Sequence, residues 1–322
     1  MRAIVQDAYG SADVLQQRDV AKPQIGDREV LVRVHAAGVD RGAWHLMTGL
    51  PYLMRVIGFG LRAPKHPVRG RELAGRVEVV GKDVTRFVSG DEVMGIGEGS
   101  FAEYAAVSED KLARKPANLS FEQAAAVPIS ASTAIQALRK ERLQPGQKVL
   151  VIGASGGVGT FAVQLASAFG AEVTGVASTP KLDLVRSIGA DHVVDYTRDD
   201  PTGGGRRYDL ILDIGGNRPL SRLRRALTPR GTLVLVGGED GGRWIGGMER
   251  QLRALAIAPF VRQRLPMFVN RERRQELETL AELIEAGKLT PVIDRTYPLR
   301  EAPEAMRQLE AGGIRGKIVI TV

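Results

Sequence analysis

A glycine-rich loop with the sequence GASGGVG, residues 153–159, carries the clearest chemical signal in the chain. It follows the apolar run Lys148–Ile152 and leads into a stretch of helical character. In the pattern G-x-G-x-x-G, Ala154 takes the first position and Gly156 and Gly159 take the other two. Residues without a Cβ let the backbone approach a pyrophosphate, and a helix N-terminus offers unpaired N–H groups and positive potential. This strand–loop–helix context favours a dinucleotide site over a tight turn without a ligand.

The residues that follow the next apolar run, Glu172–Ala177, bear on which dinucleotide binds. An NAD-preferring fold usually carries Asp or Glu there to bind the ribose hydroxyls. This chain instead carries Ser178, with Lys181 one turn further on. A serine hydrogen bond and a lysine charge suit a 2′-phosphate, and one charge-assisted contact contributes about 1.5–3 kcal/mol. We therefore expect NADPH as the cofactor, with a solvated helix lysine as the alternative role for Lys181.

The elements that must position these residues alternate between strand and helix from residue 148 to residue 237. This alternation predicts right-handed βαβ units and a doubly wound parallel sheet. Tyr196 ends the third strand, where it is expected to flank the adenosine, and Gly237 and Gly238 end the fifth, near the nicotinamide. The expected strands are Lys148–Ile152, Glu172–Ala177, His192–Tyr196, Asp209–Ile214 and Thr232–Gly237, and the expected helices are Val158–Phe169, Pro180–Ser187 and Pro219–Leu227.

The two ends of the chain have a different texture. Residues 1–120 contain short β-type runs punctuated by glycine, such as Glu29–Ala36. Residues 271–286 show apolar positions at helical spacing, and Lys317–Val322 closes the chain as a strand. We therefore expect an α/β protein in which a β-rich domain is split around a Rossmann domain. The expected boundaries are 1–122 for the first β-rich part, 123–264 for the Rossmann domain and 265–322 for the return.

Composition excludes several classes of protein. The 322 residues include no cysteine, which excludes disulfides, thiolate zinc sites, iron–sulfur clusters and a cysteine nucleophile. With four histidines, an all-protein metal site is also hard to build. No segment supplies the roughly 20 apolar residues of a membrane span, and no signal-peptide run opens the chain, so we expect a cytoplasmic protein. The net charge of +8 is spread along the chain, which favours a solvated basic surface over nucleic-acid binding.

Several segments together resemble the zinc-independent quinone oxidoreductase branch of the medium-chain dehydrogenase/reductase superfamily, the branch of zeta-crystallin. The resemblance covers essentially the whole chain. It implies a GroES-like catalytic domain split around a Rossmann domain, NADPH use and a homodimer, for which we expect the run Leu265–Val269 to mark the paired edge. The segments are GVDRGAWHLMTG (38–49), GRELAG (70–75), GDEVMGIGEGSFAEY (90–104), AAAVPISASTA (124–134), VLVIGASGGVGTFAVQLA (149–166), SIGADHVVDY (187–196) and RGKIVI (315–320).

The resemblance also assigns cofactor residues. It places Thr133 near the nicotinamide, and Ser178, Lys181 and Tyr196 around the 2′-phosphate and adenosine. The pyrophosphate is expected against Ser155, Gly156, Gly157, Val158 and Gly159.

The metal ligands of the zinc-dependent relatives are replaced. Those relatives have Cys, His and a further Cys where this chain has Asp40, Arg71 and Ile129, and the four-cysteine structural-zinc lobe is absent. Glu72 is retained, but one carboxylate does not make a zinc site, so we expect it to pair with Arg71 or another base. The resemblance therefore implies no metal ion.

Without a metal, donor groups must stabilise a developing alkoxide or enolate. Quinones and α,β-unsaturated carbonyls are already activated and need mainly positioning. Tyr52 is the best candidate donor to the oxyanion, and it lies one position from the active-site tyrosine of the family; His45 and Asp40 follow as weaker candidates. Each has a structural alternative: a pocket wall for Tyr52, a packed or surface role for His45, and a turn cap or a partner of Arg41 for Asp40.

The leading hypothesis is an NADPH-dependent reductase of quinones or enones. The alternatives are an alcohol or aldehyde oxidoreductase of the same superfamily and a non-catalytic, zeta-crystallin-like protein that binds NADPH or RNA. The apolar segment 51–64 is longer than a plain connection requires. It is expected to act as a lid or wall for a bulky apolar acceptor, or to contact a membrane or a second subunit.

Overall fold

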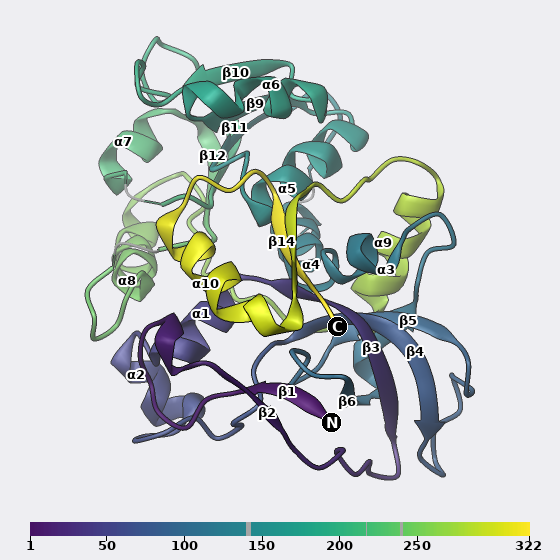
Figure 1. The fold of residues 1–322 in the computed structure, drawn as a ribbon. Coiled ribbons are helices and arrows are strands. Elements are labelled where there is room, and N and C mark those ends of the chain that lie inside the picture. Colours follow the sequence, from purple (N-terminus) through teal and green to yellow (C-terminus); the bar gives the residue numbers. More distant parts are fainter. Residues whose placement is uncertain (140–142, 217, 239–240) are drawn as a thin grey trace. The chain divides into compact units, whose positions relative to one another are not determined.

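The computed structural model describes residues 1–139, 143–216, 218–238 and 241–322, which form two compact units (Figure 1). The split unit comprises residues 1–132 and 272–322, and the parallel-sheet unit comprises residues 133–271. The two units divide ten residues later than expected at the first boundary and seven residues later at the second. The first lies inside the continuous helix α4 (Pro128–Arg139), so the change of texture near residue 120 marks the start of helical structure rather than the start of the second unit.

The parallel-sheet unit contains one five-stranded parallel sheet in the order β10-β9-β8-β11-β12. The doubly wound parallel fold is therefore confirmed. The strand order reverses between β8 and β11, and such switch points are where open α/β sheets bind their ligands. The strands are β8 (Lys148–Ile152), β9 (Glu172–Ala177), β10 (His192–Asp195), β11 (Tyr208–Asp213) and β12 (Leu227–Leu235).

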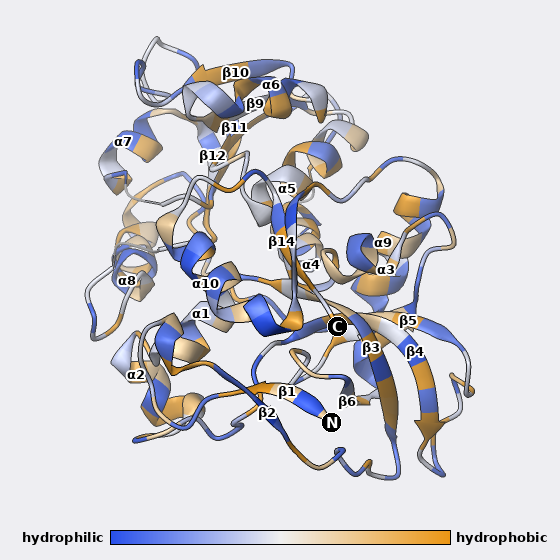
Figure 2. Ribbon diagram, in the orientation of Figure 1, coloured by the Kyte–Doolittle hydropathy of each residue, from blue (hydrophilic) through white to orange (hydrophobic). Residues whose placement is uncertain are grey.

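Burial explains why these runs form central strands. Val149, Leu150 and Val151 of β8 have no exposed surface, and such continuous apolar runs are typical of parallel strands covered on both faces. The strands of this sheet accordingly appear largely orange in Figure 2. The helices in the described part of this unit are the end of α4, α5 (Gly157–Ala168), α6 (Leu182–Ser187), α7 (Leu220–Arg225) and α8 (Met248–Ile257). Helix α8 was not predicted from the sequence.

The split unit contains a seven-stranded sheet, β13-β14-β3-β4-β5-β7, with β6 also paired to β3, and a separate two-stranded sheet of β1 and β2. The return segment completes the large sheet, because β14 pairs antiparallel with β3. The strands are β1 (Arg2–Val5), β2 (Gln16–Asp19), β3 (Glu29–Val39), β4 (Glu72–Val80), β5 (Glu92–Ile96), β6 (Tyr104–Ser108), β7 (Leu112–Arg114), β13 (Ile293–Pro298) and β14 (Lys317–Thr321).

The helices of the split unit are short apart from α9. In α9, Leu277, Leu280 and Ile284 are buried, as their spacing predicts. A π-helical turn at Arg55–Phe59 follows α2. The helices are α1 (Arg41–Thr48), α2 (Tyr52–Met54), α3 (Phe121–Ala125), α9 (Arg274–Glu285) and α10 (Ala302–Ala311). None of the helices in the described residues has the length and apolar character that a membrane crossing needs.

Candidate functional site

The glycine loop joins the end of β8 to the first turn of α5. Gly153 adopts a φ of +86°, and Gly156 is the N-cap of α5, so no capping side chain covers the helix end. A Cβ on Gly159 would lie 2.0 Å from the carbonyl oxygen of Gly153. Only glycine therefore lets α5 start this close to the turn. The uncovered first turn of α5 fits a pyrophosphate at residues 155–159.

Backbone also meets backbone at the ends of the neighbouring strands. A Cβ on Gly153 would lie 2.8 Å from the amide nitrogen of Gly215, and one on Gly237 would lie 2.0 Å from the carbonyl oxygen of Ile214. Gly238 is equally confined, since its Cβ would lie 2.3 Å from the Cα of a following glycine, Gly247. The carboxyl ends of β8, β11 and β12 are thus drawn together where a nucleotide is expected. We call this set of contacts the glycine edge.

Ser178, Lys181 and Tyr196 come together where β9 and β10 end. The Tyr196 N–H donates to the carbonyl oxygen of Ala177 at 3.2 Å, and the Lys181 N–H donates to that of Ser178 at 2.9 Å. Tyr196 is 54% exposed, so its ring is accessible to a ligand. The structure brings together the residues predicted for the adenosine end, while their contact with a cofactor stays a prediction.

Asp195 is a carboxylate at this end that the sequence analysis did not weigh. It is buried and accepts hydrogen bonds from the hydroxyls of Thr179 and Thr197, which lower the pKa of its carboxyl. The Nε of Arg198 lies 3.7 Å from it. Asp195 therefore braces the turn after β9. Its negative charge makes a cation such as Lys181 more important for holding a 2′-phosphate.

Thr133, the residue expected at the nicotinamide, lies in α4 and is 8% exposed. Its hydroxyl accepts a hydrogen bond from Nδ2 of Asn270 at 3.1 Å. The Oδ1 of Asn270 is buried and has no hydrogen-bond partner among the described residues. Asn270 is therefore a further candidate at this end. It stands alone after an apolar run, where no motif marks it.

A second residue missed from the sequence is Arg250 of α8. Its guanidinium pairs with Asp213, the fully buried last residue of β11, at 2.5 Å, and donates to the carbonyl oxygen of Arg218 at 2.8 Å. Burial raises the pKa of Asp213, although Arg250 opposes the change. Nη1 of Arg250 is buried without a partner among the described residues and lies 2.7 Å from the position of a Cβ on Gly216. The guanidinium group of Arg250 therefore lies beside the end of β11, at the switch point of the sheet.

Asp40 and His45 belong to opposite ends of α1 in the split unit. Oδ1 of Asp40 caps the helix by accepting the N–H of Ala43 at 2.7 Å, while its Oδ2 is buried without a partner among the described residues. Nδ1 of His45 forms a hydrogen bond with the carbonyl oxygen of Leu50 at 2.7 Å. Each side chain therefore stabilises the helix or its exit, and the structure does not gather the two into one cluster. A role in chemistry stays a prediction for both.

Tyr52 begins α2 and packs against a cation. The guanidinium carbon of Arg55 lies 4.9 Å from the centre of the Tyr52 ring and 4.3 Å from that of Tyr9. Arg55 also donates to the carbonyl oxygens of Gly49 and Thr48, at 2.8 and 3.1 Å. This arrangement fixes the Tyr52 ring. Tyr52 keeps its candidacy as the oxyanion donor.

Glu72, at the start of β4, is fully buried. It forms an ion pair with Lys317 of β14, and its Oε1 accepts the N–H of Ile129 at 2.7 Å. Burial raises the pKa of Glu72 to about 7, against the attraction of Lys317. Of the two expected partners, the structure therefore gives Glu72 the other base, Lys317, and not Arg71.

These side chains do not fit a zinc ion. Zinc in proteins takes four ligands from cysteine, histidine and carboxylate side chains. Both oxygens of Glu72 accept from donors, one of them the Lys317 ammonium group, which repels a cation. Arg71 is itself a cation and pairs with Glu98 at 3.3 Å and with Glu272. Asp40 alone has an oxygen to offer among the residues at the ligand positions.

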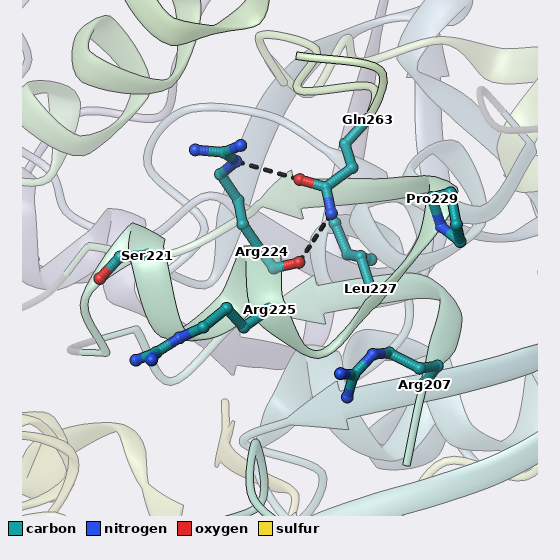
Figure 3. Close-up of a pocket in the computed structure, with 7 residues that line it drawn as sticks. All are labelled: Arg207, Ser221, Arg224, Arg225, Leu227, Pro229 and Gln263. Atoms are coloured by element: carbon teal, nitrogen blue, oxygen red, sulfur yellow. Dashed lines mark hydrogen bonds between the residues drawn. The ribbon is translucent and has the colours of Figure 1, made fainter. Parts of the chain in front are cut away.

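A cavity of about 690 Å³ lies at the opposite edge of the parallel sheet, around the amino ends of β11 and β12 (Figure 3). Arg224 is held there by Gln263: its Nε donates to Oε1 at 3.0 Å, and Nε2 of Gln263 donates to the Arg224 carbonyl oxygen at 2.7 Å. Arginines at the end of α7 complement the helix dipole. No predicted site residue lines this cavity, whose lining is Arg207, Ser221, Arg224, Arg225, Leu227, Pro229 and Gln263.

Comparisons with known proteins agree with this architecture. The alcohol dehydrogenase GroES-like domain matches residues 26–117, and the zinc-binding dehydrogenase domain matches residues 188–320. The mitochondrial NAD(P)H oxidoreductase RTN4IP1 of Mus musculus is 34% identical over 355 residues, covering 100% of this chain and 89% of the relative. The chloroplastic NADPH-dependent alkenal/one oxidoreductase of Arabidopsis thaliana is 32% identical, covering 99% of this chain and 79% of the relative. The solved quinone oxidoreductase of Coxiella burnetii superposes with a TM-score of 0.88 at 29% identity, covering 100% and 99% of the two chains.

The fold and the family similarities together define the class of this protein. It is a nucleotide-dependent dehydrogenase or reductase with a GroES-like part and a Rossmann part. Because relatives more than 30% identical align over the whole chain, the assignment can be narrower. The chain belongs to the medium-chain dehydrogenase/reductase superfamily, in its quinone oxidoreductase branch. The resemblance found in the sequence is thereby confirmed.

Proposed function

We propose that the protein is an NADPH-dependent, zinc-independent oxidoreductase that reduces quinones or α,β-unsaturated carbonyls. The uncovered first turn of α5 carries this proposal, because it lies beside the glycine edge at the switch point, where open α/β sheets bind their ligands. Relatives named for NAD(P)H, quinone and alkenal chemistry support the cofactor and the acceptor class.

The chain's own residues would share the work of binding the cofactor. The first turn of α5 and residues 155–159 would hold the pyrophosphate, and Ser178 with Lys181 would hold the 2′-phosphate. Thr133, oriented by Asn270, would stand at the nicotinamide end. NADPH supplies a hydride when it is bound.

The zinc-independent part of the proposal rests on the donors around Glu72. Because Lys317 and Ile129 already occupy its oxygens, a cation there would have to displace an ion pair in a buried site. Elemental analysis of protein purified without chelator tests this point, and we expect no stoichiometric metal. Stoichiometric zinc that is removed together with activity would contradict it.

The acceptor class follows from the same point. Without a metal, nothing in the described site lowers the pKa of an alcohol towards neutrality, whereas a quinone or enone carbonyl needs little activation. Purified protein is therefore expected to oxidise NADPH with ortho- or para-quinones or with enones. The same preparation is expected to oxidise simple alcohols barely at all. Robust oxidation of a primary alcohol without zinc, and no turnover across a broad panel of quinones and enones, would falsify this assignment.

We also propose a homodimer that forms along the edge of the parallel sheet. β12 is the last strand in the sheet order, and the chain returns beside it, where the N–H of Leu233 donates to the Arg264 carbonyl oxygen at 2.9 Å. Beyond that point Phe268 is buried, whereas Met267 and Val269 are exposed. A second copy would cover these exposed side chains. Sedimentation at micromolar concentrations is expected to give the mass of two chains, and the mass of one chain would count against the proposal.

We propose a cytoplasmic location for the protein. The mouse and Arabidopsis relatives described above are a mitochondrial and a chloroplastic protein, respectively. Cell fractionation therefore decides where this protein is located. Recovery in an organelle fraction would contradict the proposed location.

A further inference from the structure

The segment that follows β3 differs from the rest of the chain in its charge. From Arg41 to Arg71 the sequence holds six lysines and arginines and no aspartate or glutamate. The chain as a whole mixes 45 basic with 37 acidic residues. A long stretch with only one sign of charge produces a positive potential that attracts anionic surfaces.

The middle of this segment exposes aliphatic side chains. Val56, Ile57 and Leu61 are 68%, 61% and 69% exposed, and the ribbon around α2 carries orange stretches in Figure 2. We call these three side chains the apolar tip. Single exposed aliphatic residues are common on protein surfaces, but here three lie within one turn-like connection. Such a cluster marks a surface that contacts something apolar.

Two cations flank the apolar tip without a counter-ion. Arg62 and Lys65 are exposed, and neither forms an ion pair with any residue that the structure describes. Other cations of the segment are committed elsewhere. Arg69 is buried, and Arg71 pairs with Glu98. The positive charge available to a ligand is therefore concentrated beside the apolar tip.

The base of the apolar tip is held in place. Arg55 is stacked against Tyr9 and Tyr52. The Tyr9 hydroxyl donates to the carbonyl oxygen of Gly60 at 2.7 Å, and the N–H of Lys65 donates to that of Phe59 at 2.9 Å. Because these contacts fix the backbone on both sides, little conformational entropy would be lost when the tip engages a surface.

We propose that the apolar tip docks on an anionic phospholipid bilayer. Val56, Ile57 and Leu61 would enter the boundary between headgroups and acyl chains, and Arg62 and Lys65 would contact lipid phosphates. Aliphatic side chains flanked by cations are what interfacial membrane contacts use. The inference goes beyond the proposed reaction and does not depend on it.

A protein partner fits the same surface less well. The strongest contacts of protein interfaces come from Trp, Tyr and Arg, while Leu and Val are under-represented among them. Three aliphatic side chains also fall short of the roughly 800 Å² that each partner buries in a stable protein interface. A bilayer needs no shape complementarity, so a small tip is sufficient.

Vesicle co-sedimentation tests the proposal. The full chain is mixed with phosphatidylcholine vesicles with or without phosphatidylserine, in the absence of NADPH and acceptor. We expect the anionic vesicles to bind more protein and added salt to reduce that binding. Arg62→Gln/Lys65→Gln is expected to lower the partition coefficient on anionic vesicles about 30-fold. Val56→Ser/Ile57→Ser is expected to lower it at least about tenfold on both vesicle types.

Matched variants elsewhere in the split unit serve as controls. Lys82→Gln/Arg300→Gln removes two cations whose side chains are 72% and 74% exposed. Val79→Ser/Val88→Ser removes two aliphatic side chains from residues that are 49% and 64% exposed. Both control variants are expected to bind vesicles like the parent protein. Equal losses in controls and tip variants would overturn the proposal, because binding would then follow total charge or hydrophobicity.

If the serine variants fail to fold, a tryptophan placed in the apolar tip tests the proposal by its fluorescence. Ile57→Trp is expected to show a blue shift of tryptophan emission with anionic vesicles, and Val79→Trp is expected to show none. Absence of a shift at position 57 would overturn the proposal. So would tip variants that dissociate a dimer in buffer while vesicle binding persists, since the occupant would then be a second copy. None of these measurements involves turnover, so the proposed function can stand or fall separately.

Discussion

Two regions of the molecule hold their strands together by opposite means. The glycine edge of the parallel-sheet unit uses close backbone contacts, and the split unit uses the buried ion pair between Glu72 and Lys317. At the glycine edge, β8 and β11 approach so closely that a Cβ on Gly153 would lie 2.8 Å from the amide nitrogen of Gly215. In the split unit, β4 and β14 carry two charges that are taken out of water and paired with each other. The first arrangement needs the absence of side chains, and the second needs two particular side chains together.

The difference determines how each region responds to change. A Cβ added at a close backbone contact must move backbone atoms, and no second substitution elsewhere compensates for it easily. A buried ion pair behaves differently, because loss of one partner leaves an uncompensated charge, whereas loss of both can be nearly neutral. Paired substitutions therefore distinguish the two regions.

The largest effect is expected when Lys317 alone is changed. Lys317→Met leaves the Glu72 carboxyl buried without its base, so the free energy of unfolding at pH 8 is expected to fall by about 3–5 kcal/mol. Glu72→Gln/Lys317→Met removes both charges and is expected to recover most of that loss. Urea unfolding of the parent and the three variants, including Glu72→Gln, measures the cycle. Additive losses in the double variant would show that the two side chains act independently.

The same pair predicts a dependence of stability on pH. Burial raises the pKa of Glu72 to about 7 in the folded protein, from an ordinary value of 4.5. Between these two values the folded state keeps a proton that the unfolded chain has released, so rising pH lowers the free energy of unfolding through this group. The expected loss approaches about 3 kcal/mol once the pH exceeds 7.

Comparison with Glu72→Gln/Lys317→Met isolates that contribution, because all other titrating groups are shared. Unfolding is measured at intervals from pH 4 to pH 8. The parent protein is expected to lose more stability over this range than the double variant. Parallel profiles for the two proteins would contradict the raised pKa.

These regions also differ in how well the sequence predicts them. The strands β8 and β9 have the bounds that were expected, because their apolar, β-branched runs are bounded by loop residues. The position of the glycine loop followed from the same local pattern. β12 was misplaced at its start: it begins at Leu227 rather than Thr232, because α7 ends at Arg225.

The side-chain contacts could not be predicted in this way. Glu72 and Lys317 are 245 residues apart, and Thr133 and Asn270 are 137 apart. A local pattern carries no information about such partners, since the topology of the sheets and the chain's return bring them together. Arg250 was missed for a related reason, because α8 was not predicted. The sequence did place Ser178, Lys181 and Tyr196 correctly at neighbouring strand ends.

Gly159→Ala tests the steric side of the comparison. The new Cβ would lie 2.0 Å from the Gly153 carbonyl oxygen, so the loop or the start of α5 must shift. We expect a loss of about 2–3 kcal/mol in the free energy of unfolding and a larger loss in NADPH affinity, because the shifted N–H groups face the pyrophosphate. Gly242→Ala is the control, since its Cβ would meet only Glu249 Oε1, at 3.6 Å. A variant with unchanged NADPH affinity would show that this contact does not shape the binding site.

Tyr52→Phe examines a side chain of the split unit without disturbing its packing. The ring can keep its contact with Arg55, and only the hydroxyl is lost. If that hydroxyl donates to the developing oxyanion, kcat with a quinone or enone is expected to fall about 10–100-fold, on the scale of one lost donor. Thermal unfolding is expected to change little. An unchanged kcat would assign Tyr52 to the wall of the pocket.

The smallest expected effect concerns Lys181, the cation predicted to favour NADPH at the adenosine end of the parallel-sheet unit. Lys181 lies one turn beyond Ser178, close to the turn that Asp195 braces. Lys181→Ala is expected to weaken the binding free energy of NADPH by about 1–2 kcal/mol, or its affinity by about 5–30-fold. The affinity for NADH is expected to change hardly at all, because only NADPH carries the 2′-phosphate.

The control is Arg186→Ala, which removes a cation of α6 that is paired with Asp183 at 2.7 Å. This variant is expected to leave both affinities unchanged. Titration of both nucleotides into the three proteins gives the ratio of affinities directly. If Lys181→Ala weakens NADH and NADPH equally, the lysine supports the turn after β9 rather than the phosphate. The choice between the two nucleotides would then depend on backbone geometry, as the close approach of the strands does at the glycine edge.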